Sequence, residues 1–511
     1  MWWTRLSLIA IAMMLGAANS LAVIVLAAGP ALVGSDPVGD GTLPKTQSNV
    51  ILLTFDNPIE LPSGPPLSVT PIGGGQNEGD WFLCSVEPDG VTLKAIEDGP
   101  VLLDRTWYRI APTPDLEVGP FTIDLCTLQG DANGSGRVTT ADYVEVKAHM
   151  GEYTDARYDL NGTGRVTTAD YTVVKGHMGN RAPAKPPTGM VLVPAGEFQM
   201  GDTFNEGDGD ELPVHTVYLS PYHIDTYEVT NQQYADGLNW ALGQGGLIAV
   251  TNGVVYQAGS GTSYPYCNTT TVTLYSRITW NGGTFGVVEG KEDHPMVSVS
   301  WYGVVAYCNW RGAMESKPLC YDLSTWECNW GSGYRLPTEA EWEKAARGGA
   351  AGHRFPWSDT DTIQHARANY YSSASYSYDT SPTEGYHPLW GVGAWPYTSP
   401  VGFFTGALRY KADWGWPGEP TSYQTANGAN GYGLYDMAGN VMDWCYDWHA
   451  WGYYSDPEAT QPNPDGPGSG TYRVLRGGSW SANPYPRCAD RYCSSPGNRY
   501  GYGFRCSAGT P

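Results

Sequence analysis

The sequence has 511 residues and a formal net charge of −23 at pH 7, from 52 acidic residues against 29 Lys and Arg. A surface this acidic repels phosphates, so the composition argues against a nucleic-acid-binding function. At roughly 100–200 residues per domain the length predicts about three domains, and 65 Gly, 35 Tyr and 20 Trp favour a loop-rich chain over a long helical one.

The first 28 residues have the features of a secretory signal. Arg5 supplies a short positive segment, and a largely apolar stretch from Leu6 to Ala28 follows it. We interpret residues 1–28 as the signal peptide of an exported, bacterial-type protein that is secreted or held at the cell surface. Because roughly 20 apolar residues can also span a bilayer, membrane contact is expected only if the signal stays uncleaved. In an exported protein the 10 cysteines are expected to pair.

Residues 29–47 are rich in Pro and Gly and are predicted to be a linker. Residues 48–128 then alternate short apolar runs with turn clusters, which is the pattern of a small β-sandwich. Strands are predicted around residues 50–55, 81–86, 101–103, 107–110 and 121–125. Cys84 and Cys126 lie on predicted strands, and we expect a disulfide between them. Nothing in this segment indicates catalysis.

Residues 129–180 contain a tandem repeat, in which the segment from Asp131 to Asp142 recurs from Asp159 to Asp170 and a helix-like segment follows each copy. Oxygen-bearing side chains at positions 1, 3, 5, 9 and 12 of each loop, with Gly at position 6, suit the oxygen ligands and the sharp bend of a calcium site. One such loop could be a metal-free turn, but two in tandem favour calcium. The predicted ligands are Asp131, Asn133, Ser135, Asp142 and the Arg137 carbonyl in the first loop, and Asp159, Asn161, Thr163, Asp170 and the Arg165 carbonyl in the second.

This tandem resembles a type I dockerin, in which one helix follows each calcium loop. The resemblance implies docking to a cohesin module on another protein or on the cell surface, with Thr140, Ala141, Thr168 and Ala169 at the recognition positions. Calcium would fold such a module, since its loops have no stable form without the metal. The alternative is a calcium-stiffened spacer. A Pro-rich linker at residues 181–188 leads into the C-terminal domain.

Local patterns in the C-terminal domain, residues 189–511, predict three structural elements. Thr338-Glu-Ala-Glu341 is a capping box that begins a helix. The apolar spacing of residues 304–310 predicts another short helix. Arg476-Gly-Gly-Ser479 predicts a tight strand-to-turn element, because two glycines permit close backbone approach.

A series of phrases in this domain follows the order found in one protein family. They lie at residues 190–201, 225–231, 294–301, 306–310, 335–343, 355–357, 433–444, 476–480 and 503–505. On these phrases the domain resembles the formylglycine-generating enzyme, or sulfatase-modifying factor, family. The resemblance implies an irregular, C-type-lectin-like α/β fold. The whole chain is therefore expected to be multidomain, with the β-sandwich and the dockerin-like module preceding this domain.

The resemblance also implies a calcium site within residues 436–443. Its ligands would be the carboxylates of Asp436 and Asp443 and the carbonyls of Gly439 and Val441, where the family has Asn and Glu in place of the two Asp. The alternative is an Asp-rich turn without metal. A second calcium site of the family would use Asn369, but the Asp that it also needs has no clear match here.

The family oxidises a substrate cysteine to formylglycine with oxygen and a copper(I) ion, which two thiolates bind because copper(I) prefers soft ligands. The matching positions, just after the Arg-Gly-Gly-Ser phrase, hold Ala482 and Asn483. Ser479 matches an active-site serine, and Met442 stands where the enzymes have Trp. Copper is therefore expected only if thiolates elsewhere replace the missing pair. The candidate catalytic residues are Ser479, Cys488 and Cys493.

The cysteines of this domain allow several pairings. Cys308 should bond Cys506 by family match, and Cys320 and Cys328 lie close enough in sequence for a local disulfide. Cys488 matches a family cysteine whose partner position is occupied by Ala346. Cys488 and Cys493 can form either a disulfide or a thiolate pair, and the other candidates to pair with them are Cys267 and Cys445.

Two functions follow from these residues. The first is a formylglycine-generating oxidase, which lacks its thiolates at the expected positions. The second is a module that binds a peptide or glycan through aromatic faces beside the Gly-Gly-Ser turn, although core packing is the alternative for some of these rings. A hydrolase has no supporting constellation. The candidate ligand-binding residues are Trp480, Tyr485, Tyr492 and Tyr500.

Overall fold

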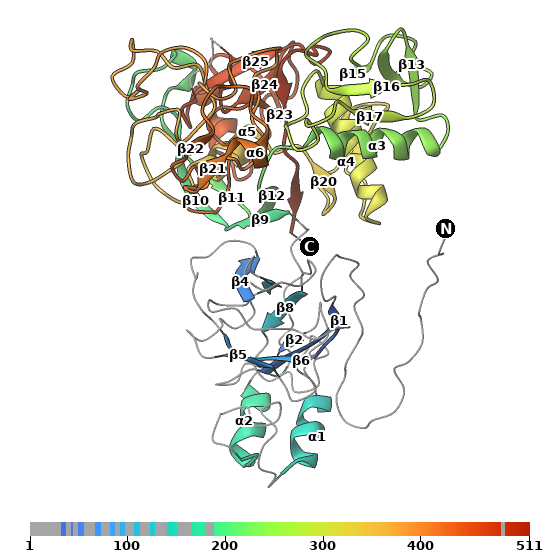
Figure 1. Ribbon diagram of the computed structural model, residues 1–511, viewed down its shortest axis with the longest axis vertical. Coiled ribbons are helices and arrows are strands. Elements are labelled where there is room, and N and C mark those ends of the chain that lie inside the picture. Colours follow the sequence, from blue (N-terminus) through green and yellow to red (C-terminus); the bar gives the residue numbers. More distant parts are fainter. Residues whose placement is uncertain are drawn as a thin grey trace. The chain divides into compact units, whose positions relative to one another are not determined.

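The computed structural model divides the chain into two compact units, Met1–Lys185 and Pro186–Pro511 (Figure 1). In the second unit the structure describes residues 189–481 and 486–510. In the first unit it describes residues 32–36, 42–43, 50–55, 67–72, 82–86, 92–97, 107–112, 123–127, 138, 140–150, 165–176 and 178. Across these residues no helix is long and apolar enough to cross a membrane.

Strands of the first unit form two four-stranded sheets, with the orders β1-β3-β6-β5 and β2-β8-β7-β4. Their bounds are β1 (Leu32–Asp36), β2 (Thr42–Leu43), β3 (Val50–Phe55), β4 (Leu67–Ile72), β5 (Phe82–Val86), β6 (Thr92–Glu97), β7 (Trp107–Pro112) and β8 (Ile123–Thr127). Strands β3, β5, β7 and β8 lie where the sequence predicts strands, and residues 101–103 lie outside the described residues. The pairing of Cys84 on β5 with Cys126 on β8 stays a prediction.

Four of the strands that the structure describes in this unit were not predicted from the sequence. β1 and β2 fall in residues 29–47, which were predicted to be a linker. β4 contains Pro71, which lies directly opposite Tyr108 on β7. β6 carries Lys94 and Glu97 among its apolar residues and pairs with strands on both sides. Pairing to neighbouring strands thus overrides weak local patterns.

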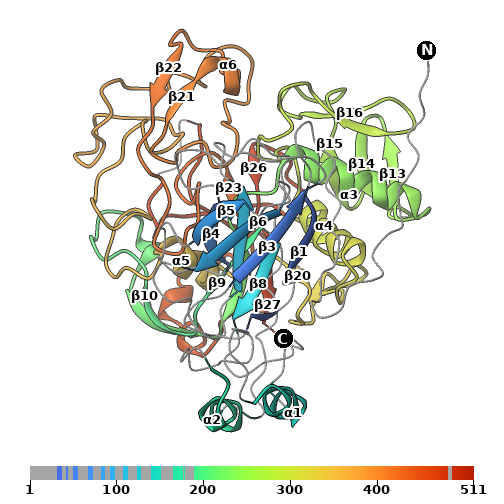
Figure 2. The ribbon, with the colours of Figure 1, turned by 60° about the horizontal axis from the view of Figure 1, so that its bottom comes forward.

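Two short helices, α1 (Thr140–Ala148) and α2 (Thr168–Gly176), lie side by side (Figures 1 and 2). Each helix begins a few residues before the predicted helix-like segment. The predicted recognition positions therefore lie in the first turn of each helix, and their four side chains are exposed, namely Thr140, Ala141, Thr168 and Ala169. The core between the helices is made of equivalent residues from the two repeats, namely Val138, Val146, Val166 and Val174. Tyr143 and Tyr171 also meet edge to face at 5.0 Å.

Most of the predicted ligands of the tandem calcium loops lie outside the described residues. This applies to Asp131, Asn133, Ser135, Arg137, Asp159, Asn161, Thr163 and the side chain of Asp142. Asp170 is fully buried, and its Oδ2 accepts hydrogen bonds from the Thr167 amide at 2.7 Å and hydroxyl at 3.0 Å. Arg165 is exposed.

In the second unit four α-helices are separated by long irregular segments. They are α3 (Asn231–Gly243), α4 (Trp301–Met314), α5 (Glu339–Ala346) and α6 (Lys411–Trp414), with 3₁₀ turns at Gly209–Glu211, Tyr453–Ser455 and Pro457–Thr460. The predicted helix around residues 304–310 is α4, and its apolar residues are buried in the main core. Ser300 caps α4 through its hydroxyl, and Thr338 caps α5 in the predicted capping box.

Strands of the second unit are short and form two four-stranded sheets and several smaller ones. The four-stranded sheets have the orders β20-β27-β12-β9 and β25-β24-β23-β26. Their strands are β9 (Met190–Val193), β12 (Tyr222–Asp225), β20 (Tyr334–Arg335), β23 (Met442–Trp448), β24 (Arg473–Arg476), β25 (Arg491–Ser494), β26 (Tyr502–Gly503) and β27 (Ser507–Gly509). The smaller sheets use β10 (Gly196–Met200), β11 (His215–Leu219), β13 (Ile248–Thr251), β14 (Val254–Gln257), β15 (Pro265–Asn268), β16 (Ile278–Trp280), β17 (Phe285–Val287), β18 (Tyr321–Asp322), β19 (Glu327–Cys328), β21 (Leu408–Tyr410) and β22 (Ser422–Gln424).

The turn after β24 is tight, as the Arg-Gly-Gly-Ser phrase predicts. Gly477 and Gly478 have φ angles of 95° and 71°, a region that disfavours residues with a side chain. A Cβ atom at Gly478 would lie 2.8 Å from Cα of Pro486, and one at Gly477 would lie 2.9 Å from Cζ2 of Trp342. The turn therefore requires glycine at both positions.

The capping box of α5 yields a stability prediction. The Thr338 hydroxyl accepts from the Glu341 amide at 3.1 Å, and a Glu341 carboxylate oxygen accepts from the Thr338 amide at 3.0 Å. Thr338→Ala should lower the free energy of unfolding by about 1 kcal/mol, because an amide at the helix start loses its partner. Thr262→Ala, at an exposed position, is the matched control and should change it by less than about 0.5 kcal/mol. Urea denaturation of both variants measures this, and equal stabilities would contradict the prediction.

Candidate functional site

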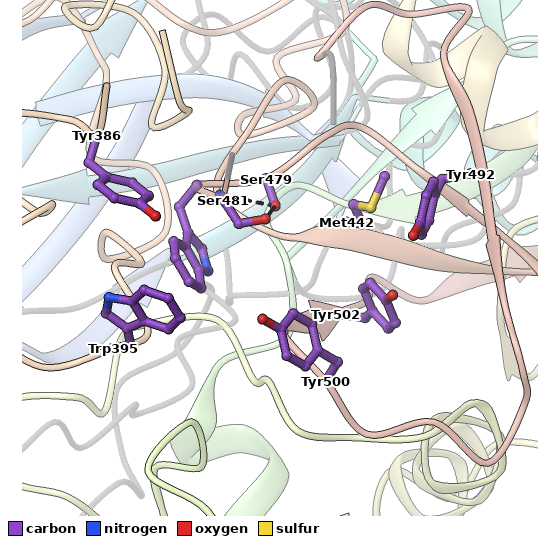
Figure 3. Close-up of a pocket in the computed structure, with 10 residues that line it drawn as sticks. Tyr386, Trp395, Met442, Ser479, Ser481, Tyr492, Tyr500 and Tyr502 are labelled. Carbon is purple, nitrogen blue, oxygen red and sulfur yellow. Dashed lines mark hydrogen bonds between the residues drawn. The ribbon is translucent and has the colours of Figure 1, made fainter. Parts of the chain in front are cut away.

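A cavity of about 340 Å³ opens beside the Gly-Gly-Ser turn (Figure 3). It lies where the ends of β23, β24 and β25, the start of β26 and the long segment between α5 and β21 meet. The four strands belong to one sheet, whereas the long segment is irregular. One wall of the pocket is therefore formed by the sheet and the other by loops. Its described lining residues are Tyr386, Trp395, Met442, Ser479, Trp480, Ser481, Tyr492, Tyr500, Gly501 and Tyr502.

The loop side of the pocket is a cluster of tilted rings around Trp480. Tyr386 and Trp395 lie together on one side of the serines (Figure 3), with ring centroids 6.2 and 5.8 Å from that of Trp480. Tyr275 joins them, 5.7 Å from Trp395 and 5.0 Å from Tyr500. The rings therefore support one another, and Trp395 keeps 41% of its surface exposed at the rim.

The sheet side of the pocket carries Met442, Tyr492, Tyr500 and Tyr502 (Figure 3). Met442 on β23 lies opposite Tyr502 on the parallel strand β26. The Tyr502 ring is 6.4 Å from Tyr492 and 6.1 Å from Tyr500. Tyr492 and Tyr500 are 46% and 45% exposed, so a ligand can reach both rings.

Two serines form the polar part of the lining. The hydroxyl of Ser481 lies 3.1 Å from that of Ser479, and the Ser481 amide donates to Ser479 Oγ at 3.2 Å. Ser479 is nearly buried at 5% exposure. Both hydrogen bonds that the structure gives the Ser479 hydroxyl stay within its own turn, and the described lining residues include no carboxylate or histidine that could act as its base. Its catalytic role stays a prediction.

The pocket is electrically neutral across its described lining. Burial raises the pKa of Tyr386 above its usual range and that of Tyr502 to about 12. Burial, together with the 3.1 Å contact to the Tyr500 hydroxyl, also raises the pKa of Tyr275. These phenols therefore stay protonated at neutral pH.

Sequence reasoning located part of this site. Trp480, Tyr492 and Tyr500, predicted as ligand-binding residues, line the pocket, whereas Tyr485 lies outside the described residues. Trp480 is only 2% exposed, so it is also a core residue. Tyr386 and Trp395 were missed, because they lie in a segment without periodicity. The density of Tyr and Trp there was the one available signal.

Cys488 and Cys493, the candidate thiolate pair, face different surroundings. Cys488 is fully buried, and burial raises the pKa of its thiol to about 12, although Arg347 and Arg476 oppose the shift. Cys493 is half-buried on β25 and hydrogen-bonds the side chain of His449. Neither belongs to the described lining of the pocket.

The other predicted sulfur pairs lie close together as thiols. The sulfur atoms of Cys308 and Cys506 are 3.8 Å apart in the core. Cys320 and Cys328 share a side-chain hydrogen bond, which lowers the pKa of Cys320 to about 7 and raises that of Cys328. Both disulfides stay predictions, as do the pairings of the buried Cys267 and Cys445.

The predicted calcium turn at residues 436–443 collects buried carboxylates around Arg505. Arg505 Nε donates to Asp443 Oδ2 at 2.8 Å, and the Gly402 amide donates to Asp436 Oδ2 at 2.6 Å. Burial raises the pKa of Asp436 to about 6. Among the described residues, Asp443 Oδ1 and both carboxylate oxygens of Glu228 are buried without a hydrogen-bond partner. Glu228 was not among the predicted ligands.

These carboxylates do not form a cluster of three metal-binding side chains, and the described part of the chain contains no such cluster. The predicted ligand set does not require such a cluster, because two of its members are side chains and two are main-chain carbonyls. The unpaired oxygen of Asp443 fits a hard cation such as calcium, which prefers oxygen ligands.

Comparison with known proteins adds two family matches. A model described as "Sulfatase-modifying factor enzyme 1-like domain" matches residues 175–508, and one described as "Dockerin type I domain" matches residues 129–179. The second match corresponds to the tandem repeat, and the first to most of the second unit.

Curated relatives match the C-terminal part of the chain. The "Serine/threonine-protein kinase pkn1" of Chlamydia pneumoniae is 33% identical over 322 residues, covering 63% of this chain but only 38% of that protein. The "Formylglycine-generating enzyme" of Streptomyces coelicolor is 34% identical over 346 residues, covering 63% of this chain and 85% of that enzyme. The "Inactive C-alpha-formylglycine-generating enzyme 2" of Bos taurus is 28% identical over 349 residues, covering 63% of this chain and 88% of that protein.

The contact of His449 with Asp210 yields a titration prediction. Burial lowers the pKa of His449, but hydrogen bonds to Asp210, at 2.9 Å, and to Cys493 outweigh it and raise the pKa to about 9. The folded state should therefore gain stability from protonated His449 that is complete below pH ~6.5 and lost as the pH rises through about 9.

NMR titration of isotope-labelled histidine measures this directly. Asp210→Asn should return the pKa of His449 toward its usual range, because the carboxylate partner is gone. Asp236→Asn, at an exposed position on α3, is the matched control and should leave it near 9. An unchanged pKa in Asp210→Asn would contradict the prediction.

Proposed function

The chain belongs to the sulfatase-modifying factor family over residues 175–508, and from this we propose that it is an exported calcium-binding protein whose C-terminal domain binds a peptide or glycan ligand without oxidising cysteine. The domain would have the C-type-lectin-like fold of its family, and the two N-terminal sheets would pack as a β-sandwich with Cys84 bonded to Cys126. The dockerin match favours a secreted or cell-surface location.

The composition of the pocket carries this proposal. Copper(I) needs soft ligands, of which thiolates are the usual ones. The described lining offers one thioether, Met442, together with aromatic rings and hydroxyls, and no thiol. The positions where the family places its two cysteines hold Ala482 and Asn483. The residues present therefore do not fit a copper(I) site.

The aromatic lining of the pocket instead suits ligand binding. Exposed aromatic rings such as Tyr492, Tyr500 and Trp395 supply large apolar faces at low cost in conformational entropy. Its volume falls in the range of small-ligand sites, about 300–1,000 Å³. The similarity to a bovine protein named as inactive supports a member of the family that does not catalyse oxidation.

Calcium would act in two places. In the tandem repeat it would fold the loops that precede α1 and α2, so that the exposed first turns of both helices are held ready for a cohesin-type partner. Type I dockerins typically bind such partners, and residues 129–179 match them. In the C-terminal domain, Asp436, Asp443 and the carbonyls of Gly439 and Val441 would hold calcium beside the turn that supports the pocket.

The alternative is a formylglycine-generating oxidase, favoured by the similarity to enzymes of that name. Cys488 and Cys493 are its only candidate thiolates near the turn. Their different surroundings, one fully buried beside Arg347 and one bonded to His449, argue against joint binding of one metal ion.

An assay for formylglycine separates the two functions. We expect no conversion when the chain is incubated with copper(I), a reductant, oxygen and a peptide carrying Cys-x-Pro-x-Arg, because the described lining of the pocket holds no thiolate pair. Mass spectrometry of the peptide measures this, with the Streptomyces enzyme as positive control. Turnover that disappears in Cys488→Ser or Cys493→Ser would overturn the proposal.

Removal of calcium should unfold the dockerin module. We expect a chelator to abolish binding to an immobilised cohesin, because the loops lose the ligand that orders them. Asp170→Ala should weaken binding in calcium, whereas Lys175→Ala, at an exposed position late in α2, should not. Binding that survives the chelator would contradict the calcium requirement, and absence of cohesin binding even in calcium would leave the spacer interpretation.

A further inference from the structure

The pocket beside Ser479 combines many aromatic faces with an absence of charge in its described lining. The rings are tilted against one another, with interplanar angles of 62° between Trp395 and Trp480 and 64° between Tyr275 and Trp395. Trp395 meets both of these rings edge to face, and Trp395, Trp480 and Tyr500 line the same pocket, so rings at several inclinations border one volume where a sugar platform needs one flat, open face. Such a set of rings is an aromatic cage, and cages of this kind bind cations through the negative face of each ring.

Two pairs of hydroxyl groups at the cage are already hydrogen-bonded to each other. Tyr275 bonds Tyr500 at 3.1 Å, and Ser479 bonds Ser481 at 3.1 Å. A glycan must replace many hydrogen bonds to water when it binds, and the described lining supplies no carboxylate, amide or guanidinium side chain to do so. A quaternary ammonium group needs no hydrogen-bond acceptors, because its nitrogen carries no hydrogen to donate.

One buried donor in the lining completes the argument. Trp480 is 2% exposed, and its Nε1 has no hydrogen-bond partner among the described residues. A Cβ atom at Gly501, another lining residue, would lie 4.0 Å from this nitrogen. The indole N–H is therefore positioned to donate to an acceptor, such as a hydroxyl or carboxylate carried by the same ligand.

The electrostatic setting agrees with a cationic ligand. The net charge of −23 draws small cations toward the protein. The Arg277 guanidinium donates to the carbonyl of Trp395 at 2.8 Å and to that of Leu274 at 3.1 Å. Arg277 is not part of the described lining.

We propose that this pocket binds a quaternary or methylated ammonium group, with Trp395, Trp480 and Tyr500 as cage walls and the Trp480 indole as donor to a neighbouring polar group of the ligand. The inference rests on the ligand-binding function proposed above and names its ligand class. The same chemistry occurs in free choline or glycine betaine and in a trimethylated lysine side chain of a peptide.

Calorimetry of the full chain with matched probes tests the charge. Choline should bind roughly tenfold more tightly than 3,3-dimethyl-1-butanol, which has the same shape without the charge. Equal affinities would overturn the cage, because they would show apolar burial alone. A peptide with trimethyllysine, compared with its unmethylated counterpart and with free choline, distinguishes the two sources.

Substitutions in the cage test the geometry. Trp395→Leu and Tyr500→Leu should each weaken choline binding by roughly three- to tenfold, because each removes one ring face. Trp395→Phe should retain most of the affinity. Trp451→Leu is the matched control, since Trp451 is 62% exposed and is not part of the lining. An equal loss in the control, or no loss in either cage variant, would overturn the assignment.

Failure of this inference differs from failure of the proposed function. If no ammonium probe binds but a glycan or an unmodified peptide binds in a Trp395-dependent way, the ligand class is wrong and the binding function stands. If choline binding is absent and the chain forms formylglycine, both are wrong. Binding of choline without formylglycine formation supports both.

Discussion

Arg476 at the end of β24 is the residue on which this domain depends most. Its side chain is fully buried and forms an ion pair with Glu343 of α5, while it donates to the carbonyls of Cys488, Ala489 and Asp490 at 2.7–2.9 Å. One guanidinium on β24 thus links α5 to the segment at residues 488–490, which leads into β25. Removing one partner of such a buried pair typically costs about 3–5 kcal/mol, because the other charge is left without compensation.

The same charges extend outward from Arg476 in a continuous network. Glu343 also accepts from Arg347 at 2.7 Å and from the Gly201 amide at 2.8 Å. Glu339 pairs with Arg491 on β25 at 2.7 Å, so α5 is bonded to both strands that flank the glycine turn. The turn itself lies against Trp342 of that helix. The position of Ser479, and with it the polar edge of the pocket, is therefore fixed by groups that never face the ligand.

The contrast between the buried ion-pair network and the pocket explains which features could be predicted from the sequence. The capping box at Thr338, the helix around residues 304–310 and the glycine turn follow from local rules, and all three are present. The tilted rings do not follow from local rules. Tyr386 and Trp395 reach Trp480 across a segment with no period, where side-chain packing between distant residues decides the path. Glu228 was missed for the same reason, since its two carboxylate neighbours are distant in sequence.

The groups that stabilise the domain, which are the buried ion pairs, are different from the groups that line the pocket. The buried ion pairs hold the turn up to Ser479, so under the proposed function Ala482 and Asn483 would stand at the family's thiolate positions without disturbing these pairs. An oxidase needs both thiolates at once, whereas a ring can leave an aromatic cage and each remaining face still attracts a cation. Loss of the metal-binding pair would therefore end the oxidation chemistry in a single step, while ligand binding could change gradually on the same scaffold. A pocket that is neutral, aromatic and supported from behind is the expected result of such a change.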